Sequence, residues 1–176
     1  MKKKNKSNNK LLLILVVLVV VVVGVLAYSF LISDSQTDSE EMGQSISIQN
    51  RDHISESETV QVYNSNPPTS GPHAGAIKGG YYDGEIEDIN GVHNLEHGFI
   101  WITYRNISTE TKARLRKIAN RYSGRVVVSE RRANDAQITL ASWGRFDKMS
   151  QEALDEDYVI RFIDKYTNQS PERFAK

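Results

Sequence analysis

The chain has 176 residues, a formal net charge of zero and no cysteine. Without cysteine it has no disulfide framework and no thiolate ligand, so any metal must be held by nitrogen, oxygen or thioether sulfur. Five of the 22 basic residues are lysines before residue 11, which leaves 17 basic against 22 acidic residues in the rest of the chain, a net charge of −5. This acidic balance argues against nucleic acid as a partner.

Residues 11–32 form an apolar run that contains no charged side chain and is rich in Leu, Val and Ile. At about 1.5 Å per residue, a helix of this length crosses a hydrocarbon core of about 30 Å. Lysines precede the run and acidic residues follow it, so residues 1–10 are expected to be a cytoplasmic basic tail. The sequence therefore predicts one transmembrane helix over residues 11–32, which anchors the protein in the cell membrane and leaves the rest of the chain extracytoplasmic.

A cleaved secretory signal is the alternative, because a basic start, an apolar run and small residues around Ala27 and Ser29 follow in the required order. The apolar run is longer than the roughly 7 to 15 residues that are usual for a signal. The chain also has no cysteine that could carry a lipid anchor. We therefore expect the helix to be retained.

Residues 33–44 are polar and acidic, which predicts a flexible linker. The remaining stretch, residues 45–176, has the usual size of one domain with its own core. It contains no internal repeat that would divide it. We expect a single extracytoplasmic domain.

The first half of this domain, up to Gly91, is rich in turn-forming residues and predicts ordered loop. The pattern changes at residues 99–104, which are apolar on both alternating faces and predict a central strand. Ser108 is expected to cap a helix that continues to Tyr122, where apolar side chains repeat at helical spacing.

Two further strands are predicted over residues 125–129 and 137–142. A last helix is expected to begin near Asp155, because acids favour a helix start and apolar residues then recur at helical spacing. The order strand, helix, strand, strand, helix predicts an α+β domain with a small mixed sheet and two main helices, preceded by the transmembrane helix.

All four histidines fall between residues 53 and 97, and imidazole is the commonest protein ligand for zinc and copper. His73 ends a proline-rich loop that is stiff before any ligand binds. His93 and His97 point the same way in a helix or in a strand, whereas Glu96 joins them only if the segment is helical. A helical turn would let Glu96 bind the metal or orient a histidine.

The predicted metal ligands are His73, His93 and His97, with His53 as the fourth ligand and Glu96 as a further one. Imidazole ligands suit copper or zinc better than magnesium or calcium, which prefer oxygen. A thioether from Met42 or Met149 is a further option for Cu(I). Neither methionine lies near the histidines in sequence, so each is expected to pack in the core or lie in the linker.

Three strings resemble the signature of a family of prokaryotic membrane-anchored proteins catalogued as domain of unknown function 3105. They are Tyr63-Asn64 followed by the PPTSGPH string at residues 67–73, the VHNLEHG string at residues 92–98, and the ASWG string at residues 141–144. The resemblance covers roughly residues 50–172. It implies a single anchor, an exported domain and a histidine-bearing signature without an established activity. Ser142 replaces an alanine of the family pattern, which leaves the histidines unchanged.

The expected function is binding of copper or zinc by a membrane-anchored extracytoplasmic protein, for metal handling or sensing rather than catalysis. One alternative is a structural histidine network in a protein-interaction or envelope assembly module. Another is a metal-dependent hydrolase, because His93-x-x-Glu96-His97 matches a pattern in which the two histidines bind zinc and the glutamate is a general base. Two expectations argue against the hydrolase. A strand is expected directly after this string, and Glu172, the distant acid that could complete such a site, is expected at the surface. The sequence identifies no protein partner.

Overall fold

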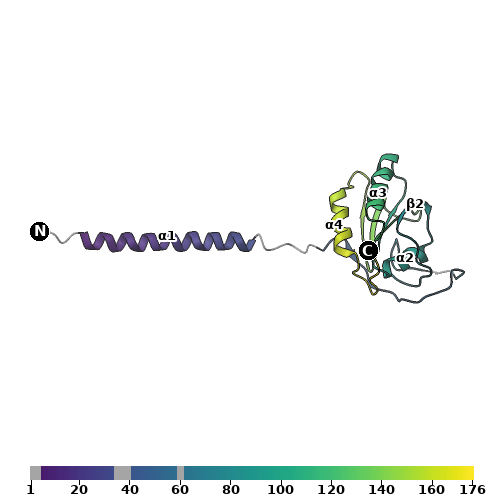
Figure 1. The fold of residues 1–176 in the computed structure, drawn as a ribbon, viewed down its shortest axis with the longest axis horizontal. Helices are drawn as coiled ribbons and strands as arrows, with labels where there is room; N and C mark the ends of the chain where they lie inside the picture. Colours follow the sequence, from purple (N-terminus) through teal and green to yellow (C-terminus); the bar gives the residue numbers. More distant parts are fainter. Residues whose placement is uncertain (1–4, 34–40, 59–61) are drawn as a thin grey trace. The chain divides into compact units, whose positions relative to one another are not determined.

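The structure is a computed structural model that describes residues 5–33, 41–58 and 62–176. The chain divides into two compact units, Met1–Glu41 and Met42–Lys176. In the first unit, helix α1 spans Asn5–Ser33 (Figure 1). Within the described residues, no helix has both the length and the apolar character needed to cross a membrane. The transmembrane helix over residues 11–32 stays a prediction, and most of the predicted linker falls on residues 34–40, outside the described residues.

The second unit is built on a six-stranded mixed sheet with the order β1-β6-β5-β3-β4-β2. The pairs β3–β4 and β4–β2 are parallel, and the other pairs are antiparallel. The α+β class is confirmed, but the sheet is larger than the three strands that the sequence predicted. The strands are β1 (Gln44–Ser45), β2 (Gly80–Glu85), β3 (Ile100–Tyr104), β4 (Val126–Glu130), β5 (Ile138–Ser142) and β6 (Arg145–Met149).

Among its described residues this unit has three helices, where the sequence predicted two. The predicted helices correspond to α3 (Thr109–Arg121) and α4 (Glu156–Tyr166). Ser108 caps α3 as expected, because its side chain accepts a hydrogen bond from the backbone N–H of Thr111. The additional helix is α2 (Asp88–Glu96), which settles the conformation of the string that carries the last two histidines.

The helices cover both faces of the sheet. In Figure 1, α4 and α2 lie on opposite sides of the strands. The larger core lies between the sheet and helices α3 and α4, and Met42 and Met149 pack against it. The smaller core lies on the α2 side and consists of Leu95, Trp101, Val127, Ala141 and Phe146.

Helix α2 lies directly on Trp101, a fully buried residue of the central strand β3. A Cβ atom built on Gly91 would lie only 2.5 Å from the indole ring of Trp101. Only glycine therefore allows the helix to come this close to the sheet. This contact fixes the distance between β3 and the side chains that α2 presents on its other faces.

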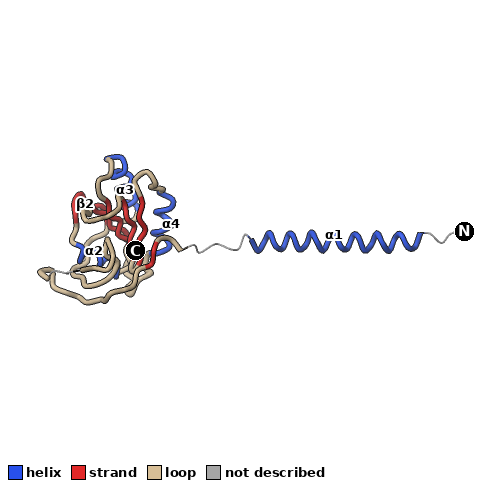
Figure 2. Tube along the Cα trace, turned by 180° about the vertical axis from the view of Figure 1, so that it is seen from behind, coloured by secondary structure: helices blue, strands red, loops and turns tan. Residues whose placement is uncertain are grey.

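The long segment between β1 and β2, drawn in tan in Figure 2, runs beside α2. The backbone of Ala74 donates to the carbonyl of Ile89 at 3.3 Å, and the side chain of Asn94 bonds both the N–H and the C=O of Ile77. The loop prediction holds for most of this segment. It was wrong for β2 and for the start of α2, which the turn-forming residues around Gly84 concealed.

Candidate metal centre

All four histidines lie together beside α2. The centres of the His73 ring and the His53 ring are 4.5 Å apart, and those of His73 and His93 are 4.8 Å apart. The ring centres of His93 and His97 are 4.4 Å apart. An isolated parallel bridge pairs the backbones of His53 and His73, while α2 carries His93, and His97 forms its C-cap. The fold thus brings together histidines from three separate parts of the chain.

One group of four ligand atoms lies close enough together to hold a metal ion. His53, His73, His93 and Glu96 each offer one atom, and these atoms all lie within 4.8 Å of one another. The Nε2 atom of His73 is 2.9 Å from Glu96 Oε2 and 3.3 Å from His53 Nε2, and the third side of this triangle is 3.7 Å. A tetrahedral zinc site with bonds of about 2.0–2.2 Å has edges of about 3.3–3.6 Å between its ligands. The His73–His53 distance fits this range, whereas His73 and Glu96 lie closer together and His53 and Glu96 slightly farther apart.

A backbone hydrogen bond sets the tautomer of neutral His73 to the one that a metal ligand needs. Its Nδ1 atom lies 2.8 Å from the carbonyl oxygen of Gly71, which can only accept a hydrogen bond. The proton of neutral His73 is therefore on Nδ1, and the lone pair is on Nε2. That lone pair faces the carboxylate of Glu96 and the ring nitrogen of His53.

Glu96 and His73 meet in a fully buried position, with neither side chain exposed. The Oε2 atom of Glu96 has no hydrogen-bond partner among the described residues. A buried carboxylate oxygen without a donor is costly, and a second lone pair 2.9 Å away adds repulsion. A metal ion, or an extra proton on His73, would remove both costs.

His93 is also poised as a neutral ligand. Burial lowers its pKa to about 4, and the nearby charges of His97, His73 and His53 act in the same direction against the opposing effect of Glu96. The Nδ1 atom of His93 is buried and has no partner within the described part of the chain. A neutral imidazole at physiological pH can bind metal without first losing a proton.

Glu96 supplies the negative charge of the site. Burial acts to raise its pKa, but the hydrogen bond from Arg51 and the charges of His73, Arg51 and His53 outweigh this and lower the pKa overall. The Nε atom of Arg51 donates to Glu96 Oε1 at 2.6 Å. Glu96 is therefore ionised at neutral pH, with Oε1 held by Arg51 and Oε2 turned toward the histidines.

His97 belongs to a second group, with Glu96 and Glu172, whose ligand atoms also lie within 4.8 Å of one another. The Nε2 atom of His97 is 3.1 Å from His93 Nε2 and 3.1 Å from Glu172 Oε2. The sequence placed His97 with the main ligands and Glu172 at the surface. Instead, Glu172 contacts His97 and is about one-third exposed (32%). The methionines lie elsewhere, in the core on the α3 and α4 face.

Arg51 and Glu172 were not predicted as members of the cluster. Arg51 precedes His53 by two residues, so in extended backbone both side chains point to the same side, and this spacing could have identified it. Glu172 has no such signal. It reaches the site because its backbone N–H donates to the carbonyl of Glu96 at 3.1 Å, a contact between segments far apart in sequence.

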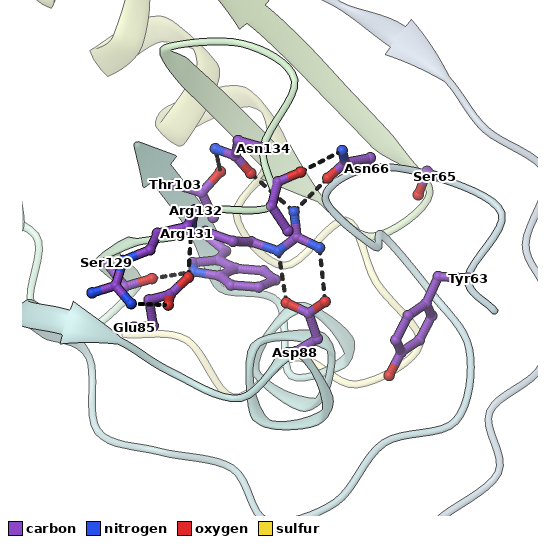
Figure 3. Close-up of polar contacts among 12 residues, drawn as sticks. Tyr63, Ser65, Asn66, Glu85, Asp88, Thr103, Ser129, Arg131, Arg132 and Asn134 are labelled. Carbon is purple, nitrogen blue, oxygen red and sulfur yellow. Dashed lines mark hydrogen bonds and ion pairs between the residues drawn. The ribbon is translucent and has the colours of Figure 1, made fainter. Parts of the chain in front are cut away.

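A buried arginine joins the loop that leads to His73 and helix α2, two of the three segments that carry the ligands; Figure 3 shows its contacts with Asn66 and Asp88. Arg131 is 8% exposed, and its Nε and terminal nitrogens donate to both oxygens of Asp88, the first residue of α2, at 2.7 and 2.8 Å. Another nitrogen donates to Asn66, in the loop that leads to His73, and to Asn134 at 3.1 Å. Arg131 therefore ties the His73 loop and α2 to the same point of the sheet.

A family model described as a protein of unknown function (DUF3105) matches residues 53–176. The matched region begins at His53 and includes all four histidines, Glu96 and Glu172, but not Arg51. No curated protein and no solved structure matches the chain.

Proposed function

The chain belongs to the DUF3105 family of proteins of unknown function, and we propose that it binds one transition-metal ion through His53, His73, His93 and Glu96. The observation that carries this proposal is the approach of His73 Nε2 to Glu96 Oε2, 2.9 Å apart in a fully buried position. When His73 is neutral, both atoms present lone pairs, and Glu96 Oε2 then has no donor among the described residues. A positive charge between them is the simplest way to stabilise this arrangement.

Zinc or copper suits this group best, because it offers three imidazoles and one carboxylate. Magnesium and calcium prefer shells made of oxygen ligands. The side chain of His53 is 58% exposed, whereas those of His73 and Glu96 are fully buried. An exposed ligand lets the ion enter and leave from solvent, which supports a role in metal handling or sensing.

The proposed setting is the outer side of a cell membrane, with residues 11–32 as the anchor. The support for this is the uncharged apolar run, the lysines before it and the acidic residues after it. A protein placed there would meet metal ions from outside the cytoplasm. Its protein partner is not part of the proposal.

A hydrolase is the less favoured function, although Glu172 lies beside His97. In the His-x-x-Glu-His pattern the glutamate must be free to take a proton from water. Here Arg51 holds Oε1 of Glu96, and Oε2 lies within the ligand group. Glu96 is thus better placed to bind a metal than to act as a base.

Metal content of the purified full chain tests the proposal. After removal of metal, the protein is offered zinc, Cu(II) and Cu(I) separately, and bound metal is measured by elemental analysis. We expect about one equivalent on the wild type and a clear loss in the His73→Asn and His93→Asn variants. His97→Asn is the comparison variant: His97 lies outside the four-ligand group but contacts His93, so this variant should retain more metal than either of the other two.

Glu96→Gln separates the two roles of the glutamate. Loss of a ligand should weaken metal binding by at least tenfold, because loss of an outer-shell partner alone typically costs about 10–100-fold. If Glu96 were only a general base, the Glu96→Gln variant would lose the base but retain the metal. A folded wild type that retains no metal would contradict metal binding and favour a protonated His73 paired with Glu96 as a structural network.

A further inference from the structure

The second group, Glu96, His97 and Glu172, has the composition of a second metal position that shares Glu96 with the first. Its ligand atoms lie within 4.8 Å of one another. Backbone hydrogen bonds hold it together: the N–H of Glu172 donates to the carbonyl of Glu96 at 3.1 Å, and the N–H of Phe174 donates to that of His97 at 3.0 Å. In two-metal centres a shared carboxylate commonly lies between ions about 3.5–4 Å apart.

Arg51 lies where the positive charge of such a second ion would be needed. Its Nε atom is 2.6 Å from Glu96 Oε1, and a terminal nitrogen is 3.8 Å from Glu172 Oε1. The guanidinium group thus lies between the two carboxylates of this group. Its charge is permanent, because arginine does not lose its proton in proteins.

The two groups differ in how well their atoms are satisfied. The four-ligand group contains Glu96 Oε2 and His93 Nδ1, both buried and without a hydrogen-bond partner among the described residues. In the second group, Glu96 Oε1 accepts a hydrogen bond from Arg51, and Glu172 Oε2 is 3.1 Å from His97 Nε2. The first group therefore has unsatisfied buried atoms, whereas the second already has a permanent cation, Arg51.

We propose that Arg51 takes the place of a second metal ion and keeps the centre mononuclear; the mononuclear centre itself rests on the proposed function. A second divalent ion at Glu96 and Glu172 would meet the like charge of the guanidinium at close range. It would also have to displace the short hydrogen bond from Arg51 to Glu96. Arg51 thereby determines how many ions the cluster holds, without binding metal itself.

The test is the number of zinc ions per chain, measured by elemental analysis on the purified full chain after dialysis against excess zinc. The wild type is expected to hold one ion and Arg51→Met two. Arg51→Lys keeps a positive charge and should hold one. Adding Glu172→Gln to Arg51→Met removes a ligand of the second group and should return the count to one. Circular dichroism checks that each variant is folded, and Arg51→Gln gives the same test if Arg51→Met does not fold.

Each outcome separates this inference from the proposed function. A folded Arg51→Met that binds no more zinc than the wild type would overturn the role of Arg51, and so would a wild type that already holds two ions. A wild type without zinc would overturn the proposed function and with it the mononuclear centre, but not the exclusion of an ion from the second group by Arg51. In that case a single ion that appears in Arg51→Met and disappears with Glu172→Gln would still support the role of Arg51.

Discussion

At His73, one backbone hydrogen bond decides which ring nitrogen is free to bind. Because Nδ1 donates to the carbonyl of Gly71, the free lone pair of the neutral ring points into the cluster. His53 differs from His73 because its side chain is exposed. Its Nε2 atom lies 3.7 Å from Oε2 of Glu96, the carboxylate that His73 also contacts. The site thus combines a fixed, buried ligand with an accessible one.

His93 should make the metal-free protein sensitive to mild acid. Its pKa is about 4 in the folded state against 6.5 for an ordinary histidine, because burial and the neighbouring histidines disfavour its charged form. Between these pH values the unfolded chain binds more protons than the folded one, so the free energy of unfolding should fall as pH falls from about 6.5 to about 4. Urea unfolding at several pH values measures this dependence.

The control for this prediction is His93→Asn, which cannot titrate in that range. Its unfolding free energy should depend less steeply on pH than that of the wild type over the same interval. An equally steep dependence in the variant would assign the effect to other groups. Both proteins are compared without metal, because a bound ion would itself compete with protons.

At the level of elements, the link between Arg131 and Asp88 should support both stability and metal binding. Arg131→Met leaves Asp88 and Asn66 without their donor. Breaking a buried ion pair costs about 3–5 kcal/mol. Because the side chain of Asp88 is 31% exposed, we expect a smaller loss, about 2 kcal/mol, in the free energy of unfolding. Metal affinity should also fall, by about tenfold, because the His73 loop and α2, two of the three ligand segments, lose a common support.

The matched control is Arg114→Met. Arg114 joins α3 to the start of α4 through Glu156 and the carbonyl of Leu154, on the other side of the sheet from α2. Its loss should lower stability but leave metal affinity unchanged. Equal losses of metal affinity in both variants would mean that general destabilisation, not the position of Arg131, weakens the site.

The sequence predicted the elements whose buried residues form a regular apolar pattern, either an unbroken run in a strand or a stripe at helical spacing. β3 has five buried residues in a row, and α3 and α4 each bury one apolar stripe and have a side-chain cap at the N-terminus. β6 was missed because its sequence, RFDKM, is mostly charged, although it pairs with β5 over five residues. β2 was missed because it is an edge strand rich in glycine and tyrosine.

The candidate site could be predicted only in part for a related reason. Histidine is rare and reactive enough that four in 45 residues draw attention. Arg51 and Glu172 are ordinary charged residues whose importance depends on what they contact. Helical spacing correctly placed His97 beside His93. The grouping of His97 with Glu172 depends on tertiary structure and could not be predicted.

At the level of the whole molecule, residues 41–176 should fold and bind metal without α1. The compact unit begins at Met42, whose N–H donates to the hydroxyl of Tyr166 at 2.9 Å. All residues of both candidate metal groups lie within this unit. We expect the shortened chain to match the full chain in metal content and in thermal unfolding of the domain, measured by elemental analysis and circular dichroism. Loss of metal from a folded shortened chain would contradict this independence.

The cluster draws its groups from Arg51 through Glu172, and this spread sets an order of events in time. At about 5–20 residues per second, roughly 6–24 s separate the synthesis of the first group from that of the last. When the last histidine, His97, has been made, the chain still lacks β3 to β6 and Glu172, so the sheet that supports the site is not yet formed. The compartment where the chain completes its fold would therefore select the ion, and a domain that folds only after crossing a membrane would take its metal from the supply on the far side.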